Sequence, residues 1–485
     1  MDRDLISIQE ARDLIKRAKE AQLKLSRLSQ KELDEIVKSM AEEAYKNSER
    51  LAEMAVLETG YGRYEDKIIK NKFASKIVYE SIENVKTIGI LRRDDEKKII
   101  EIGVPVGVIA ALIPSTNPTS TTIYKALIAI KSGNSIVFSP HPSAAKCIFE
   151  TAKILEEAAK RVGAPDGIIG CIENPTMEAT NELMKHKDVA LILATGGSAM
   201  VRAAYSSGKP ALGVGPGNVP AFIERTADIP LAVRRIIESK TFDNGTICAS
   251  EQAIVTEECI KEKVKNELIM QGGYFLNEEE ARKVERVLVN PCGGLNPKIV
   301  GQPATKIAQM ADIKIPDNVK VLIKEEEGVG KEFPFSMEKL SPMLAFYTEK
   351  NWEKACERCI EILNYGGLGH TLVIHSNNEE VIMEFAMKKP VSRLLINTPA
   401  SQGAIGATTN LQPALTLGCG SIGGSSTSDN VGPLHLINIR RIAYGVKESK
   451  ELFNEECENV LDLDYLKKLI INELNKIQKG GILNG

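Results

Sequence analysis

The feature that most constrains the fold of this sequence is a regular alternation of strand-like and helix-like segments between about residues 104 and 223. Short apolar runs at 135–138, 168–172 and 189–194 are each followed by a segment whose apolar residues have helical spacing. Two strands joined through a helix run parallel in one sheet, because the helix returns the chain to the edge where the first strand began. The alternation therefore predicts an α/β fold with a doubly wound parallel sheet.

The residue patterns before and after this alternation are different. A chain of 485 residues is also longer than a single hydrophobic core usually supports. Residues 1–85 have helical spacing throughout, with Ser29 as a predicted N-cap, and residues 88–113 contain short β-like runs. After residue 240 a second series of strand-like and helix-like segments begins, and 399–428 is a long loop rich in Gly, Ser and Thr. We expect two α/β regions and a smaller β element.

Composition excludes several classes of function. A net charge of −3 and a pI of about 6.1 provide no basic surface for nucleic acid. The N-terminus lacks the pattern of a secretory signal, and the longest apolar run, near 104–113, is too short to cross a membrane, so we expect a cytoplasmic protein. Cys356 and Cys359 form a CxxC on a helical pattern without further ligands nearby, so no metal site is expected.

Cys248 is the candidate nucleophile. It lies on a small polar loop, 241–250, that leads into the apolar strand-like run 253–255, where a substrate can reach a thiol. The thiolate is the reactive form, so such a site must be accessible and must favour negative charge. A lone cysteine is more often a small buried hydrophobe, but the polar neighbours favour the catalytic interpretation here.

Three other segments could serve this nucleophile. The amide of Asn117, in the segment 114–118, could stabilise an oxyanion together with the backbone N–H of Cys248, although Asn-Pro alone is usually a turn. The turn 195–198 precedes a helix whose N-terminus could bind a pyrophosphate. Glu338 could accept hydrogen bonds from a ribose, or it could be a solvated surface charge.

Taken in their order along the chain, these segments resemble those of the aldehyde dehydrogenase superfamily, and the resemblance covers residues 5–446. The motifs STNPT at 115–119, GLGHT at 367–371 and LGCGS at 417–421 are similar to its coenzyme-A-acylating branch, in particular to the aldehyde domain of bifunctional aldehyde–alcohol dehydrogenases. The resemblance implies that Cys248 and Asn117 are catalytic. It implies that the cofactor-binding residues are Pro114, Ser115, Thr116, Ser139, His141, Thr195, Gly196, Gly197, Ser198, Gly213, Val214, Gly215, Glu338 and His370. For His370, a purely structural role in its loop is an equal alternative.

The resemblance also implies a domain organisation. Residues 1–87 and 107–240 would form a Rossmann-type NAD-binding domain and 241–420 an α/β catalytic domain. Residues 88–106 and 421–446 would form a small β oligomerisation arm, which predicts a homodimer or a homotetramer. Residues 447–485 would be a linker and a C-terminal amphipathic helix.

One departure from the superfamily concerns the product. Hydrolytic members carry a glutamate that activates water, and matching the glycines of 213–217 to that motif puts Gly213 at its position. Water without a positioned base is a poor competitor, so the resemblance implies transfer of the acyl group to coenzyme A. Ser139 stands where hydrolytic relatives often have a lysine, which leaves NAD as the first choice and NADP as the alternative.

The expected reaction is the reversible oxidation of a short-chain aldehyde to acyl-CoA, through a thiohemiacetal and a thioester on Cys248. The apolar residues Ile247, Leu415 and Leu417 favour acetaldehyde, then propionaldehyde. A sulfonated aldehyde, a hydrolytic enzyme that makes a free acid, and a scaffold protein without activity remain alternatives.

The C-terminal segment 463–479 is predicted to be an amphipathic helix. Its apolar residues share one face: Leu466, Leu469, Ile470, Leu474 and Ile477. Such a helix after a polar linker resembles the encapsulation peptides that direct enzymes into bacterial microcompartments by docking on a shell protein. The alternative is that this face packs on the protein's own core. The expected location is thus the cytoplasm, either free or inside a microcompartment.

Overall fold

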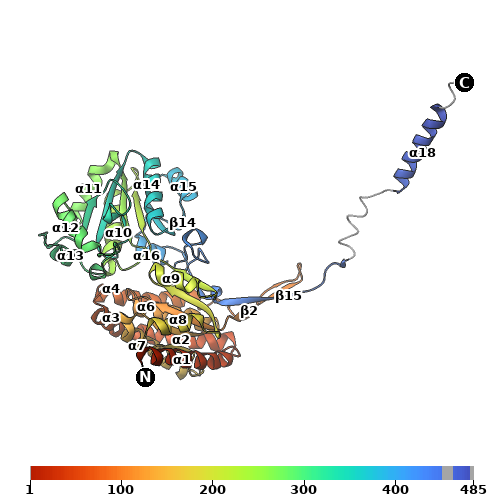
Figure 1. Ribbon diagram of the computed structural model, residues 1–485, viewed down its shortest axis with the longest axis horizontal. Coiled ribbons are helices and arrows are strands. Elements are labelled where there is room, and N and C mark those ends of the chain that lie inside the picture. The colour runs from red at the N-terminus through yellow and green to blue at the C-terminus, as the bar shows by residue number, and fades with distance from the viewer. Residues whose placement is uncertain (1, 450–462, 481–485) are drawn as a thin grey trace. The chain divides into compact units, whose positions relative to one another are not determined.

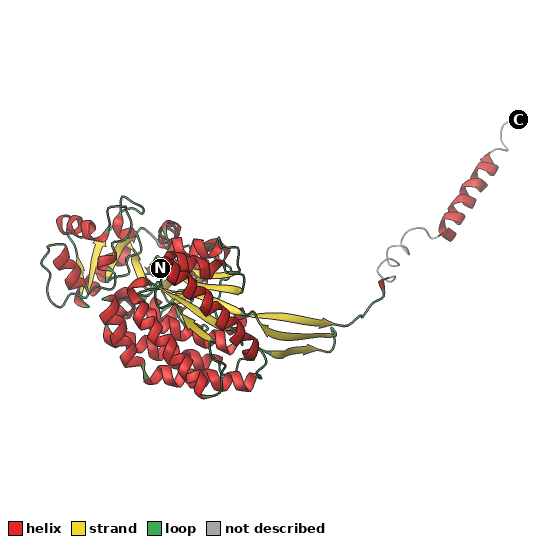
Figure 2. Cartoon of the chain, turned by 60° about the horizontal axis from the view of Figure 1, so that its bottom comes forward, coloured by secondary structure: helices red, strands yellow, loops and turns green. Residues whose placement is uncertain are grey.

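The computed structural model of the chain describes residues 2–449 and 463–480 (Figure 1). It divides into two units, one formed by residues 1–89 and 104–438 and the other by 90–103 and 439–485. The first unit contains two parallel sheets with their covering helices, which Figure 2 shows as yellow strands among red helices. The second contains most of a three-stranded sheet and the C-terminal helix. The α/β fold predicted from the alternating segments is confirmed.

The first sheet has five parallel strands in the order β5-β4-β3-β6-β7. Its central strand β3 is apolar and fully buried along its whole length, as expected of a parallel sheet that is covered on both faces. The strands are β3 (Val108–Ile113), β4 (Ser135–Pro140), β5 (Ile169–Cys171), β6 (Val189–Thr195) and β7 (Ala211–Val214). The helices that alternate with them are α6 (Pro118–Lys131), α7 (Ala145–Arg161), α8 (Met177–Lys185) and α9 (Ser198–Tyr205).

The N-terminal helices pack on this sheet and its helices. α1 contacts α8 and β4, and α2 contacts α7 and α6 (Figure 1). The predicted N-cap is confirmed: the Ser29 hydroxyl accepts from the Glu32 N–H, and the Glu32 carboxylate accepts from the Ser29 N–H in return. These helices are α1 (Arg3–Leu25), α2 (Gln30–Lys46), α3 (Ser48–Thr59), α4 (Tyr64–Lys72) and α5 (Val78–Ile82), with a π-helical turn (Phe73–Ile77) between α4 and α5.

The second sheet has seven parallel strands in the order β10-β11-β12-β9-β8-β13-β14. Its strands are β8 (Val219–Ile223), β9 (Glu251–Glu257), β10 (Gly273–Phe275), β11 (Val321–Glu325), β12 (Met343–Glu349), β13 (Gly369–His375) and β14 (Val391–Ile396). Its larger helices are α10 (Ile229–Thr241), α11 (Lys261–Met270), α12 (Glu278–Leu288), α13 (Ala304–Met310), α14 (Trp352–Tyr365) and α15 (Glu379–Lys388), and the short α16 (Ala400–Ala404) follows β14.

One strand corrects the sequence analysis. β8 was expected to continue the first series, but it pairs with β9 and β13 in the second sheet. The chain therefore passes from one sheet to the other between β7 and β8. The periodicity of a buried strand does not state which sheet it joins, because pairing partners are distant in sequence.

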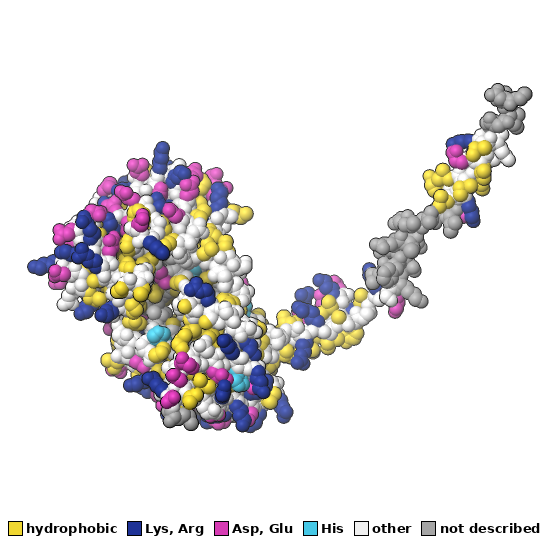
Figure 3. All heavy atoms as spheres, viewed as in Figure 1, with side chains coloured by type: hydrophobic (Ala, Val, Ile, Leu, Met, Phe, Trp, Pro, Cys, Tyr) yellow, Lys and Arg dark blue, Asp and Glu magenta, His cyan; other side chains and the backbone are white. Residues whose placement is uncertain are grey.

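The third sheet is made of β1 (Gly89–Asp94), β2 (Ile99–Pro105) and β15 (Ile437–Ala443), in the order β1-β2-β15. The predicted C-terminal helix is confirmed as α18 (Leu463–Gly480), and Figure 3 shows yellow apolar side chains along it. Residues 450–462 of the predicted linker lie outside the described residues. Among the described helices, none is long and apolar enough to cross a membrane.

Candidate active site

A cavity of about 350 Å³ lies where four strands of the five-stranded sheet end. Its walls include the segments 112–117, 139–142, 195–197 and 214–216, which contain the last residues of β3, β4, β6 and β7 and the residues after them. Ligands of open parallel sheets bind at this carboxyl edge. The opposite wall comes from loops of the seven-stranded sheet, with Thr246, Ile247, Cys248, Glu338, Leu340, Ile405, Leu415 and Leu417.

Cys248 lies on the turn between the short 3-10 helix η3 (Phe242–Gly245) and β9. Its Sγ is 3.3 Å from Nε2 of His370, which stands at the start of β13. Gly217 permits this approach, because a β-carbon there would lie 2.1 Å from the Cys248 carbonyl oxygen and 3.4 Å from the His370 ring. The fold thus brings together a thiol from a turn and an imidazole from a strand that are far apart in sequence.

Both groups are neutral in the resting protein. Desolvation of the half-buried Cys248 raises its pKa to about 12, with a further contribution from the Glu338 charge, and full burial lowers the pKa of His370 to about 3. Nδ1 of His370 lies 2.9 Å from the Thr371 hydroxyl. If Nδ1–H donates to this hydroxyl, Nε2 is left to accept the thiol proton, so the pair has the geometry of a nucleophile with its base.

Arg393 on β14 contacts the backbone next to the imidazole of His370. Its guanidinium donates to the carbonyl oxygens of His370 (3.0 Å) and Gly418 (2.7 Å), and its Nε lies 3.3 Å from the Thr371 hydroxyl. A buried arginine that binds backbone carbonyls fixes loop positions. The sequence analysis did not identify it, because a single arginine in a strand has no recognisable pattern.

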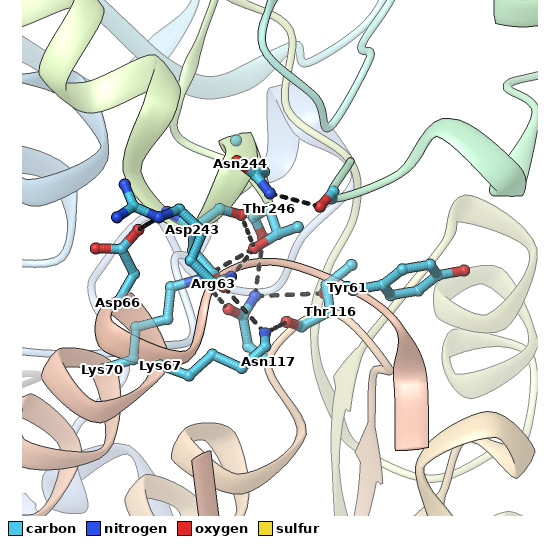
Figure 4. A network of polar contacts seen from close by, with 12 residues as sticks. Tyr61, Arg63, Asp66, Lys67, Lys70, Thr116, Asn117, Asp243, Asn244 and Thr246 are labelled. Carbon is cyan, nitrogen blue, oxygen red and sulfur yellow. Dashed lines mark hydrogen bonds and ion pairs between the residues drawn. The ribbon is translucent and has the colours of Figure 1, made fainter. Parts of the chain in front are cut away.

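Asn117 belongs to a buried polar network at the end of the cavity near Cys248 (Figure 4). Its Oδ1 accepts a hydrogen bond from Lys70 Nζ (2.6 Å), and its Nδ2 donates to the carbonyl oxygen of Thr246 (3.0 Å). Lys70 also pairs with the carboxylate of Asp243, which Lys67 contacts at 3.0 Å. Neither lysine was identified from the sequence, since a lysine on a helix is normally solvated.

The other end of the cavity fits a dinucleotide. The Thr195 hydroxyl is buried and has no hydrogen-bond partner among the described residues. Gly197 precedes α9, and no side chain caps that helix, so its first N–H groups are available to a pyrophosphate. Glu338 is half-buried, desolvation raises its pKa to about 7, and its Oε1 accepts from the Gly217 N–H at 3.1 Å.

Most of the predicted site residues line this cavity, but Gly213, Ser198 and His370 do not. The expectation for Gly213 needs correction: a β-carbon there would lie 2.8 Å from Val201 and Tyr205, so this position faces α9. The next residue, Val214, lines the cavity instead. Alternation along a strand explains the change, because neighbouring residues face opposite sides of a sheet. The predicted residues that do line the cavity are Pro114, Ser115, Thr116, Asn117, Ser139, His141, Thr195, Gly196, Gly197, Val214, Gly215, Cys248 and Glu338.

Comparisons with known proteins identify the family of the chain. The bifunctional aldehyde-alcohol dehydrogenase AdhE of Escherichia coli is 47% identical over 442 residues, which are 90% of this chain and 50% of that protein. The chain thus spans about half the length of the curated relatives it matches. The crystal structure of an acetylating aldehyde dehydrogenase from Geobacillus thermoglucosidasius is 58% identical, with a TM-score of 0.91, and the match covers 92% of this chain and 99% of that one.

Two propionaldehyde dehydrogenases are more distant. One, from the fucose utilisation bacterial microcompartment of Clostridium phytofermentans, is 30% identical with a TM-score of 0.82, over 91% of this chain and 98% of that one. The other, from Rhodopseudomonas palustris with bound propionyl-CoA, is 26% identical with a TM-score of 0.81, over 90% and 94%. The profile of the aldehyde dehydrogenase family matches residues 5–272. By sequence and fold, this chain belongs to the aldehyde dehydrogenase family.

Proposed function

We propose that the protein oxidises a short-chain aldehyde with NAD and transfers the acyl group to coenzyme A, reversibly. The observation that carries this proposal is the position of Cys248. Its sulfur contacts the neutral imidazole of His370 at one end of a cavity whose other end has the features of a nucleotide site. The acetylating relatives support the same reaction class.

The first step is the attack of Cys248 on the aldehyde carbonyl. As Sγ bonds to the carbonyl carbon, the thiol proton passes to Nε2 of His370, which is neutral and 3.3 Å away. The oxyanion then faces two donors. The backbone N–H of Cys248 donates to no acceptor among the described residues, and the second N–H of Asn117 has only a long contact of 3.3 Å with the Thr116 hydroxyl.

The nucleotide end positions the hydride acceptor. A bound NAD would accept the hydride that leaves the Cys248 adduct as the thioester forms. The helix N-terminus at Gly197 and the Thr195 hydroxyl would hold the pyrophosphate, and Glu338 would accept from ribose hydroxyls. Lys70, at the nucleophile end, is the only Lys or Arg among the described residues that line the cavity. No cation is therefore placed for a 2′-phosphate, which favours NAD over NADP.

The residues that line the cavity favour release of the acyl group to coenzyme A over release to water. Val214 presents an apolar side chain, and Glu338, the only carboxylate among the described residues that line the cavity, accepts from the Gly217 N–H. His370 is neutral again after losing its proton and can accept the proton of the incoming thiol. Ile247, Ile405, Leu415 and Leu417 line the nucleophile end, which suits a short aliphatic acyl chain.

The experiment that tests the proposal compares products with and without coenzyme A. Acetaldehyde and NAD should give NADH in a single burst without coenzyme A, and continuous NADH with acetyl-CoA when it is present. Cys248→Ser should abolish both. Continuous release of acetate without coenzyme A, at a rate equal to that with it, would contradict the proposal.

We also infer a homo-oligomer held by the three-stranded sheet. β1 and β15 are the edge strands of this sheet, and Ile90, Ile439 and Ile442 on them are exposed. Unpaired strand edges with apolar side chains favour pairing with a second copy. Ile439→Lys and Ile442→Lys together should shift the mass in light scattering towards the monomer, and an unchanged mass would contradict the inference.

For α18 we propose docking on a microcompartment shell protein. Its side chains Leu469, Ile470, Leu474 and Ile477 are between 43% and 69% exposed, and an exposed apolar face of this kind is typical of a docking helix. Truncation after Tyr444 should leave activity unchanged and abolish co-purification with shells. Loss of activity on truncation would instead assign the helix to the enzyme's own structure.

A further inference from the structure

Lys70 is a buried cation with a carboxylate partner, yet it also reaches the cavity. Its side chain is 4% exposed, and the residue lines the cavity together with Asn117 and Cys248. Its Nζ donates to three acceptors: the carboxylate of Asp243, the Thr246 hydroxyl at 3.0 Å and Oδ1 of Asn117 at 2.6 Å. The ammonium group thus uses all three of its protons on the loop of the nucleophile and on the residue opposite it.

Asp243 anchors this cation. Its backbone is in the left-handed region, with a φ of +49°, and its N–H donates to Asp66 at 2.8 Å. One carboxylate oxygen accepts from the Arg63 N–H at 2.7 Å, and the other contacts both lysines. Gly62 leaves room for the carboxylate, since a β-carbon there would lie 1.9 Å from Oδ1 of Asp243. The turn between α3 and α4 is therefore built around this ion pair (Figure 4).

The contact between Lys70 and Asn117 decides which end of the Asn117 amide faces the reacting atoms. An amide has a donor end and an acceptor end of nearly equal shape, and an oxyanion is stabilised only by the donor end. A cation on Oδ1 makes the reversed orientation unfavourable, because that orientation would set the NH₂ group against an ammonium. The Thr246 carbonyl accepts from Nδ2 on the other side at 3.0 Å, so both contacts select one orientation.

We propose that Lys70 is a positioning residue that fixes the amide of Asn117 with its N–H towards the oxyanion formed on the Cys248 substrate. This role rests on the proposed attack by Cys248. Lys67 lies in the same ion pair but has a different contact: its Nζ donates to the Thr116 carbonyl at 3.1 Å and not to the Asn117 side chain. The chain therefore supplies a matched control for the loss of one buried lysine.

The test is a double-mutant cycle on the full-length enzyme. Lys70→Met should lower kcat for NADH formation by about 10- to 100-fold, because a mispositioned oxyanion donor loses part of the 10²- to 10³-fold that a donor typically provides. KM for NAD should change by less than about twofold, because no nucleotide contact is lost. Asp243 keeps Lys67 as a partner, so the carboxylate is not left unpaired.

Two further variants distinguish a positioning role of Lys70 from a purely structural one. In Asn117→Ala the amide is absent, so adding Lys70→Met should lower kcat by less than about twofold. Lys67→Met should cost less than about threefold in kcat, because the Asn117 amide keeps its cation. Losses that multiply in the Lys70–Asn117 double variant, or an equal loss in Lys67→Met, would overturn the proposal. If Lys70→Met does not fold, Lys70→Arg, which keeps the charge but not the geometry, enters the same cycle.

The proposed role of Lys70 and the proposed function of the enzyme would be contradicted by different results. If the wild-type enzyme makes free acid instead of acyl-CoA, the proposed acceptor is wrong, but the attack on the aldehyde and the predicted cycle are unchanged. If acyl-CoA forms as proposed and the losses multiply, the reaction stands and the role of Lys70 is wrong.

Discussion

The two ends of the cavity are built in different ways. The nucleotide end comes mostly from strand ends and one helix N-terminus of the five-stranded sheet, and its groups are backbone N–H, a hydroxyl and small residues, with the Glu338 carboxylate added from the loop before β12. The nucleophile end combines α4, the loop after β3, the loop before β9 and the start of β13, and it contains a buried ion pair beside a neutral thiol and imidazole. Binding can thus rest on local backbone geometry, whereas the chemistry needs groups from several distant segments.

The strongest way to test this difference is to remove the base at the nucleophile end. His370→Ala should lower the rate of the NADH burst by about 10²- to 10⁴-fold, the usual contribution of a general base, with little change in NAD binding. Rapid-mixing absorbance at 340 nm measures the burst, and His370→Gln is the matched polar control. A burst of normal rate would show that another group takes the thiol proton.

A change of pH should have an effect of intermediate size on the KM for NAD, through the carboxylate of Glu338. The pKa of Glu338 is raised to about 7 by burial, so the carboxylate is ionised above this pH and protonated below it. Only the ionised form accepts hydrogen bonds with both oxygens. KM for NAD should therefore rise by up to about tenfold as the pH falls from 8 to 6.

Glu338→Gln is the control for that titration, since it keeps the shape and cannot ionise. Its KM for NAD should be raised at pH 8 and nearly constant down to pH 6. A wild-type profile without an inflection near pH 7 would place the Glu338 carboxylate outside NAD binding.

The smallest effect is expected at the nucleotide end itself. Thr195→Val removes the buried hydroxyl that has no partner among the described residues and keeps the volume of the side chain. One lost hydrogen bond of about 1 kcal/mol should raise KM for NAD about fivefold without changing kcat. Thr195→Ser is the matched control and should behave like the wild type. Unchanged KM in Thr195→Val would mean that the hydroxyl does not contact the nucleotide.

Local patterns predicted much of this molecule. The strands β4 and β6, the N-cap Ser29 and the loop of Cys248 could be placed from periodicity, apolar runs and turn residues, because these signals depend on neighbouring residues. The errors occurred where partners are distant: β8 joins the other sheet, and Val214 instead of Gly213 faces the cavity.

The sequence by itself determined the parallel α/β architecture and the turn 195–198 at a helix N-terminus, and it singled out Cys248 as the candidate nucleophile. Only the tertiary structure decided that His370 meets the sulfur and that Lys70, paired with Asp243, donates to the Asn117 amide. The physical reason is that backbone preferences act over a few residues. A buried charge or a neutral imidazole, by contrast, depends on desolvation and on partners that folding brings together from far along the chain.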